Sequence, residues 1–250
     1  MKKPFSCIKV CGMRQSNNIR QIESLGIDMM GFIFWEPSSR YVFQKPDYLP
    51  ACARIGVFVN ATPEYILSTI RTYGLSYIQL HGQESPEFCH HLRLALSQSG
   101  LASVQLIKAF SISTPEDIES VRQYETLCCF LLFDTKTPLP GGSGKQFDWQ
   151  ILQHYSGTLP FLLSGGIGPD DIKRLQEFHH PLCAGIDLNS RFEISPGVKD
   201  ATLLRNFLTQ LNTKTHQTQN EPHQQIIPRE KAKHLFSLVL CRTSSIGQYR

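Results

Sequence analysis

The segment IGVFVNATPEYILSTIRTYGLSYIQLHG (residues 55–82) contains two apolar runs joined by a helix with recognisable ends. Thr62 is placed to cap the helix, Pro63 fits its first turn, and Gly74 follows its last residue. The apolar runs lack the strict alternation of a strand with one wet face, so both faces of each strand should be covered. This segment predicts two buried parallel strands connected by a helix.

The same unit recurs along the chain. Eight short apolar runs begin 22 to 31 residues apart, and helical signals fill most of the gaps between them. The predicted strands cover residues 8–11, 30–34, 55–59, 77–80, 104–109, 130–133, 161–163 and 185–188. The predicted helices cover residues 16–25, 63–73, 85–96, 114–124, 148–154, 169–178 and 200–211. Pro46 and Pro50 interrupt residues 44–53, so the helix expected there should be a stub or irregular.

Eight strand–helix units predict an α/β fold, a (β/α)8 barrel with a parallel eight-stranded sheet, over residues 1–212. An open doubly wound sheet is the alternative. That fold usually has fewer strands, and the sequence CGMRQS after the first predicted strand lacks the G-x-G-x-x-G fingerprint. The closed barrel is therefore the better prediction.

Residues 213–250 fall outside the repeat. The stretch TKTHQTQNEPHQQ (213–225) is polar and Gln-rich, which predicts disorder. The apolar run at 235–241 could add a strand or a short helix, or it could have no role. We expect a C-terminal extension that is disordered or weakly packed.

The net charge of +4 is concentrated in this extension, which holds six Lys or Arg and two acidic residues. The other 212 residues carry 19 basic and 19 acidic groups, and a neutral body argues against a nucleic-acid partner. No apolar stretch has the length of a membrane span or the form of a signal peptide, and no C-x-x-C pattern predicts a metal site. We expect a cytoplasmic protein without a membrane partner, whose site could still hold a small anion.

Cys11 and Asp134 stand at the ends of the first and sixth predicted strands, where a (β/α)8 barrel builds its active site. Both can point into the barrel mouth, which makes them candidates for a base and an acid. Lys9 lies two residues before Cys11 and shares its strand face, so its ammonium group should lower the pKa of the thiol. The alternatives are structural: Cys11 as a packing residue, and Asp134 as a cap for the following loop.

Loops after the later strands are candidates for binding a phosphate. Glycines let backbone amides approach an anion closely, although a tight turn is the alternative reading of a Gly-Gly pair. Residues 137–145 hold three Gly and two Pro but do not match the P-loop spacing, which favours a mobile lid over the mouth or else an ordinary surface loop. The candidate phosphate contacts are Gly142, Gly165, Gly166, Asn189 and Ser190.

Two further side chains could meet a ligand at the mouth. Arg40 follows a polar turn after the second predicted strand, where its guanidinium could bind a planar carboxylate or simply face solvent. His81 ends the fourth predicted strand and could contact a ligand or satisfy a loop carbonyl.

Seven motifs stand out along the chain: IKVCGM (8–13), GFIFWEPSSRYV (31–42), GVFVN (56–60), IQLHGQE (78–84), LLFDTKTPLPGGSGKQFDW (131–149), LLSGGIGP (162–169) and GIDLNSRFEISPGVKD (185–200). In these motifs the chain resembles the phosphoribosylanthranilate isomerase family of tryptophan biosynthesis. The resemblance covers about residues 6–212, and the motifs occur in the family's order.

This resemblance implies the eight-stranded barrel and an Amadori rearrangement without a cofactor or a metal. The substrate would be N-(5-phosphoribosyl)anthranilate and the product 1-(2-carboxyphenylamino)-1-deoxyribulose 5-phosphate. The family's general base falls on Cys11, its general acid on Asp134 and its carboxylate-binding arginine on Arg40. Members with a single barrel often act alone, so we expect a monomer rather than a dimer.

One residue departs from the family's pattern, and two other functions stay open. Arg191 stands where many members have a small residue, so it could point outward or add a cation for the phosphate. Another barrel enzyme acting on related phosphates is one alternative, such as the synthase of the next step, which relies on catalytic Lys and Glu residues. A phosphate-ligand binder without catalysis is the other, although a binder has no need of a base such as Cys11.

Truncation after Asn212 should leave activity and melting temperature nearly unchanged, because the removed segment lies outside the eight-unit repeat. Thermal unfolding and turnover of the truncated and full-length chains provide the comparison. A large loss of either would show that the extension packs on the barrel.

Overall fold

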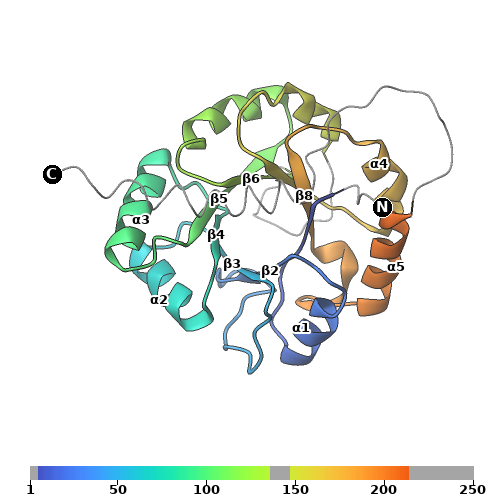
Figure 1. Cartoon of the computed structure of the whole chain (residues 1–250), viewed down its shortest axis with the longest axis horizontal. Helices are drawn as coiled ribbons and strands as arrows, with labels where there is room; N and C mark the ends of the chain where they lie inside the picture. The colour runs from blue at the N-terminus through green and yellow to red at the C-terminus, as the bar shows by residue number, and fades with distance from the viewer. Residues whose placement is uncertain (1–4, 136–146, 214–250) are drawn as a thin grey trace.

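The chain folds into a closed barrel of eight strands, as the sequence predicts. A computed structural model describes residues 5–135 and 147–213. Neighbouring strands run parallel in sequence order, and the first pairs with the eighth, which excludes the open sheet. Figure 1 shows the strands near the centre with the helices around them. The strands are β1 (Cys7–Val10), β2 (Met29–Ile33), β3 (Ala53–Phe58), β4 (Tyr77–Leu80), β5 (Gln105–Ile112), β6 (Phe130–Thr135), β7 (Phe161–Leu163) and β8 (Cys183–Leu188).

The helices lie where the gaps between apolar runs predict them, but several are short or of the tighter 3₁₀ form. The α-helices are α1 (Ser16–Glu23), α2 (Pro63–Tyr73), α3 (Pro86–Gln98), α4 (Ile172–Glu177) and α5 (Ala201–Asn212). The 3₁₀-helices are η1 (Pro115–Tyr124), η2 (Trp149–His154), η3 (Pro169–Asp171) and η4 (Ser190–Phe192). The predicted helix at 169–178 is thus divided into η3 and α4, and residues 44–53 form no helix.

Local sequence explains how α2 begins and ends. The hydroxyl of Thr62 accepts a hydrogen bond from the backbone N–H of Tyr65 at 3.4 Å, and Pro63 occupies the first turn. Gly74 ends the helix with a φ of 58°, a left-handed conformation that costs glycine little. The predicted capping of this helix is confirmed.

A short hairpin follows η4 and was not predicted. Its strands are β9 (Glu193–Ser195) and β10 (Val198–Lys199), and they pair antiparallel. Because the sequence ISPGVK is brief and contains Pro and Gly, it shows no strand pattern. The hairpin nevertheless matters for the site, since it carries two buried charged side chains.

Side chains of β1 alternate between two apolar cores. Ile8 and Val10 pack in the outer core with residues of the surrounding helices. Cys7 and Cys11 belong to the inner core, which fills the barrel. Lys9 lies between them on the inner face and is completely buried. The period of two along a strand therefore aims the Lys9 and Cys11 side chains into the barrel interior.

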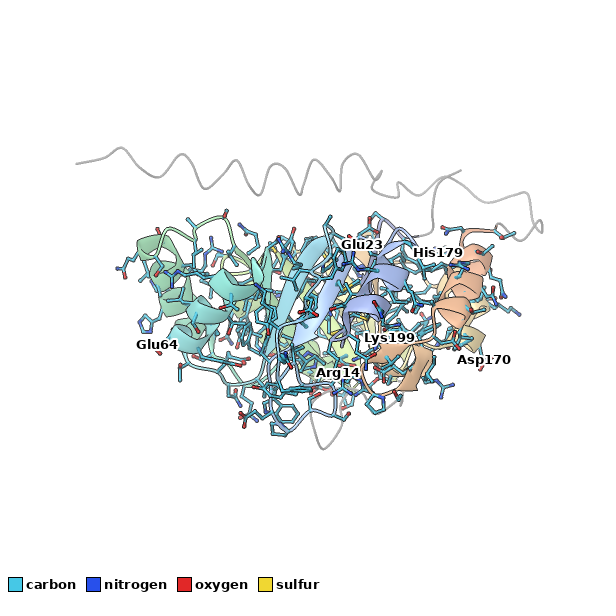
Figure 2. The ribbon with its side chains drawn as sticks, turned by 90° about the horizontal axis from the view of Figure 1, so that it is seen from below. Arg14, Glu23, Glu64, Asp170, His179 and Lys199 are labelled. Atoms are coloured by element: carbon cyan, nitrogen blue, oxygen red, sulfur yellow. The ribbon has the colours of Figure 1, made fainter. Side chains whose placement is uncertain are left out.

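The loops that follow the strands all lie at one end of the barrel. In Figure 2, Glu64 and Asp170, near the starts of α2 and η3, lie toward the lower side. Glu23 and His179, which lie at or after helix ends, are on the upper side. The lower side is thus the mouth at the carboxyl ends of the strands, where barrels of this kind place their sites.

Within the two described ranges, no helix has the length and apolarity needed to cross a membrane. The C-terminal extension predicted from residue 213 onward lies almost wholly outside these ranges.

Replacing Gly185 with alanine should destabilise the barrel by about 3 kcal/mol, because the added methyl would overpack the interior. Its Cβ would lie 2.1 Å from the carbonyl oxygen of Cys7, the residue that pairs with Gly185 across the β1–β8 seam. Urea unfolding gives the loss of free energy. Gly100→Ala is the control, since it meets nothing within 4 Å and carries only a left-handed φ of 72°. If Gly185→Ala lost no more free energy of unfolding than Gly100→Ala, the expectation would be contradicted.

Candidate active site

One pocket at the mouth brings together most of the residues singled out from the sequence. Side chains and backbone from β1, β2, β3, β4, β6, β7 and β8, or from the loops after them, line it. Gly142 lies outside the described residues, as does the rest of the predicted lid, and Lys9 lies beneath the pocket. The predicted residues that line the pocket are Cys11, Arg40, His81, Asp134, Gly165, Gly166, Asn189 and Ser190.

Cys11 follows β1 and is almost fully buried, with 3% of its surface exposed. A side chain at Gly31 on β2 would place its Cβ 2.6 Å from the Cys11 sulfur, so only glycine leaves room for the thiol there. The backbone N–H of Cys11 donates to the carbonyl of Leu188 at 2.9 Å, which extends the β1–β8 pairing to the pocket.

The pKa of the Cys11 thiol is raised above its usual value. Burial is the main cause, and the charge of Asp187 adds to it. Lys9 and Lys199 both lower the pKa, but together they do not offset the burial. The expectation of a lowered pKa at Cys11 is therefore wrong. Lys9 acts in the expected direction, yet the sequence could not show how thoroughly the thiol is withdrawn from water.

Lys9 forms a buried ion pair with Asp187 on the neighbouring strand β8. The distance from Lys9 Nζ to Asp187 Oδ2 is 2.8 Å, and the two side chains are 0% and 5% exposed. Burial works to lower the pKa of Lys9, but the charges of Asp187 and Cys11 outweigh it and raise the pKa. The ammonium group beside Cys11 therefore stays charged at neutral pH.

Asp187 was not predicted as a site residue, although it is a lone carboxylate at the end of an apolar run. Its Oδ1 atom is buried and has no hydrogen-bond partner among the described residues. Burial raises the pKa of Asp187, Lys9 opposes this, and the nearby Asp134 adds to it. An acceptor that is buried, lines the pocket and has no partner in the protein is suited to a hydroxyl or N–H of a ligand.

Asp134, near the end of β6, is oriented by two contacts, and the second of its partners is itself held by Gln79. Its Oδ1 accepts from the backbone N–H of Thr135 at 2.8 Å, as in the predicted cap, and its Oδ2 lies 3.3 Å from Nε2 of His81. The amide nitrogen of Gln79 lies 2.6 Å from Nδ1 of His81. If Gln79 donates there, the imidazole proton lies on Nε2 and faces Asp134. His81 thus contacts Asp134, an interaction that neither sequence alternative anticipated.

Arg40, in the loop after β2, is held by a carboxylate, so the solvent-facing alternative is wrong. Its Nε donates to both oxygens of Glu193, at 2.9 and 3.0 Å, and its Nη2 donates to Oε2 at 2.7 Å. Glu193 also accepts from Nζ of Lys199 at 2.6 Å. Sequence analysis missed Glu193 and Lys199, because both lie on the unpredicted hairpin.

Four of the five candidate phosphate residues lie at the ends of the neighbouring strands β7 and β8, and the fifth, Gly142, lies outside the described residues. Gly165 and Gly166 have φ values of 91° and 69°, which few other residues adopt. Asn189 accepts from Nζ of Lys199 at 2.8 Å through its side-chain oxygen. Arg191 is exposed, and its Nε lies 2.9 Å from where a Cβ on Gly168 would stand. Arg191 therefore lies against the loop that follows β7.

No group of three or more His, Cys, Asp or Glu side chains in the described ranges is arranged to hold a metal ion. The pocket instead holds isolated acids, each beside a cation or a histidine. Such an arrangement suits proton transfer and the binding of anionic groups.

Comparison with known proteins identifies relatives along nearly the whole barrel. The family model for N-(5'phosphoribosyl)anthranilate (PRA) isomerase matches residues 8–210. An N-(5'-phosphoribosyl)anthranilate isomerase of Phocaeicola vulgatus is 51% identical over 208 residues, which span 83% of this chain and 98% of that protein. The corresponding protein of Parabacteroides distasonis is 50% identical over 211 residues, covering 82% of this chain and 92% of that one.

Solved structures give the same result. The phosphoribosyl anthranilate isomerase of Thermotoga maritima is 29% identical, with a TM-score of 0.67 over 82% of this chain and 98% of that one. A structure of such an isomerase in complex with reduced 1-(o-carboxyphenylamino)-1-deoxyribulose 5-phosphate matches with a TM-score of 0.66 at 27% identity, over 82% and 97% of the two chains.

In the free protein, Cys11 should be a neutral thiol at pH 7, because burial lifts its pKa above the usual 9.0. The difference in ultraviolet thiolate absorbance between wild type and Cys11→Ala, followed against pH, should therefore rise only above pH 9. Lys9→Met should move this rise to still higher pH, since it removes a cation that lowers the pKa. Lys173→Met, at a lysine side chain that is 88% exposed, is the control and should move nothing. A midpoint below pH 9 in the wild type would contradict this assignment.

Proposed function

Because the chain belongs to the N-(5'-phosphoribosyl)anthranilate isomerase family, we propose that it catalyses the Amadori rearrangement of N-(5'-phosphoribosyl)anthranilate. The product is 1-(2-carboxyphenylamino)-1-deoxyribulose 5-phosphate, an intermediate of tryptophan biosynthesis. The observation that carries the proposal is the meeting of a thiol from the end of β1 and a carboxyl from β6 in one pocket.

In the first step, Asp134 acts as the general acid. It gives its proton to the ribose ring oxygen as the bond from this oxygen to C1′ breaks, and the nitrogen lone pair forms the C=N bond of a Schiff base. His81, whose Nε2 lies 3.3 Å from Asp134 Oδ2, can stabilise the carboxylate that this step leaves behind. The contact of Asp134 with the backbone N–H of Thr135 fixes its other oxygen.

In the second step, Cys11 acts as the general base. Its thiolate takes the proton from C2′, the C–H electrons form a C1′–C2′ double bond, and the C=N electrons return to nitrogen. The enolamine then tautomerises to the ketone. The Schiff base is cationic, so its arrival beside Cys11 favours the thiolate in the same way as Lys9 and Lys199. The thiol proton leaves to solvent through the pocket that Cys11 lines, so a thiol that is neutral in the free protein becomes a base once the ring has opened.

The pocket also offers groups that suit the two ends of the proposed substrate. We propose that Gly165, Gly166, Asn189 and Ser190 bind the phosphate, with Gly142 from the loop after β6, and that Arg40 binds the anthranilate carboxylate. Support for the phosphate site comes from the left-handed conformation of the two glycines and their position beside the β8 loop.

The test is conversion of phosphoribosylanthranilate by the purified chain, followed as the loss of the substrate's fluorescence. Cys11→Ala and Asp134→Asn should each lower kcat by about 10²–10⁴-fold, the usual contribution of a general acid or base. Affinity for the product should change little, because both groups act mainly in the transition state. Cys52→Ala and Asp47→Asn, outside the pocket, are the matched controls.

Near-normal kcat in Cys11→Ala would remove the thiol from its role. Loss of the folded state in Asp134→Asn, seen by circular dichroism, would favour a structural role for that carboxylate. A wild-type chain that binds the product without converting the substrate would favour the binder without catalysis.

A further inference from the structure

The hairpin β9–β10 brings two charged side chains to the mouth that the proposed acid–base chemistry does not use. Glu193 and Lys199 have side chains that are 5% and 0% exposed. Burying such groups is costly unless they are paired, so their position calls for an explanation. Both contact groups that line the pocket, namely Arg40 and Asn189.

Glu193 occupies one edge of the Arg40 guanidinium and leaves the other edge available. The three hydrogen bonds between them use Nε and Nη2 of Arg40. Among the described residues, no group hydrogen-bonds to Nη1 of Arg40. A guanidinium gripped along one edge cannot rotate freely, so the remaining N–H groups keep a fixed direction.

Lys199 holds Glu193 in place and balances its charge. Its ammonium group lies 2.6 Å from Oε1 of Glu193 and 2.8 Å from the side-chain oxygen of Asn189. Asn18 on α1 fixes the Lys199 backbone from both sides, since the two residues exchange hydrogen bonds of 2.8 Å. Burial lowers the pKa of Lys199, and the charge and hydrogen bond of Glu193 oppose this. With Lys199 protonated beside Glu193, the cluster Arg40–Glu193–Lys199 carries one net positive charge.

Glu193 keeps its negative charge in this setting. Burial alone would raise its pKa, but the hydrogen bond from Arg40 and the charge of Lys199 outweigh burial and lower the pKa. The backbone N–H of Gly197, in the turn of the hairpin, also donates to Glu193 at 3.0 Å. Each charged group of the cluster is therefore fixed by at least two hydrogen bonds.

Gly12 allows this cluster to lie directly beside the thiol. A Cβ at this position would stand 2.7 Å from Cδ of Arg40, 2.9 Å from Oδ1 of Asn189 and 3.4 Å from Nζ of Lys199. Gly12 follows Cys11 directly and has a φ of 78°. The free edge of Arg40 is thus built next to the base, where the aromatic end of the proposed substrate must lie.

We propose that Glu193 and Lys199 are positioning residues, which orient Arg40 so that its free edge receives the planar carboxylate of the substrate. Glu193 sets the direction of the guanidinium, and Lys199 restores the positive charge that Glu193 would otherwise cancel. This inference rests on the proposed function, and it makes binding of the carboxylate depend on the hairpin β9–β10.

The test compares two ligands that differ only in the carboxyl group. The first ligand is reduced 1-(o-carboxyphenylamino)-1-deoxyribulose 5-phosphate, an analogue of the product. The second is the same compound without the carboxyl group on its phenyl ring. Glu193→Gln should weaken binding of the first ligand by about tenfold or more, the factor that corresponds to losing one charge-assisted hydrogen bond. Binding of the second ligand should stay within about twofold, because its phosphate and sugar are unchanged.

Lys199→Met is a second variant, so the proposal can be tested even if Glu193→Gln does not fold. It should also weaken binding of the carboxylated ligand selectively, since the cluster then carries no net charge. An effect transmitted through Asn189 would weaken both ligands equally, because the phosphate is common to both. Glu36→Gln is the matched control: it removes an exposed carboxylate from the same loop as Arg40 and should change neither affinity.

Unchanged or tighter binding of the carboxylated ligand in Glu193→Gln would overturn the proposal, since Glu193 would then compete with the ligand for Arg40. An equal loss for both ligands in folded variants would overturn it too, by showing a general structural effect. Failure of the wild-type chain to bind the carboxylated ligand or to convert the substrate would instead contradict the proposed function.

Discussion

The buried ion pair between Lys9 and Asp187 is the interaction on which the site depends. These residues face each other across the seam where β1 closes the barrel on β8, and 2.8 Å separates their charged atoms. Placing two charges inside an apolar barrel costs several kcal/mol for each ion, and replacing such a pair with apolar residues often stabilises a protein. Stability alone therefore does not account for it. Its position directly beneath Cys11 does, because it fixes an ammonium group beside a thiol that has almost no contact with water.

Burial of the Cys11 thiol raises its pKa and the positive neighbours lower it, and this balance suits the proposed role of Cys11 as a base that acts only after the ring has opened. In the free protein burial prevails and the pKa of Cys11 is raised. Lys9 and Lys199 oppose this from two directions, so the additional positive charge of an iminium can shift the balance. A thiolate that forms only beside a cationic intermediate is protected from side reactions before the substrate arrives.

The positions at which strands end could be predicted from the sequence. The side chains that contact the site residues could not. Because buried apolar runs mark parallel strands clearly, the ends of the predicted strands could be located. Cys11, Asp134 and the two glycines after β7 were therefore correctly expected at the same end of the barrel, and they line one pocket. Glu193 and Lys199 could not be predicted as site residues, because they lie on a hairpin of five strand residues whose sequence is too short to establish an alternation between apolar and polar side chains. The direction of the Lys9 effect on Cys11 was predicted correctly, but its size relative to burial depends on how the whole barrel packs.

The geometry of the site is set by missing side chains as much as by those present. Gly31 makes room for the sulfur of Cys11, and Gly12 makes room for Arg40 and Asn189. A methyl group at Gly31 would press on the sulfur of Cys11, and one at Gly12 would press on Arg40 and Asn189. The glycines in IKVCGM and GFIFW therefore do not primarily serve strand formation, which glycine weakens. They allow the Cys11 thiol and the charged cluster of Arg40, Glu193 and Lys199 to share a small volume, where charges are weakly screened and therefore act strongly on one another.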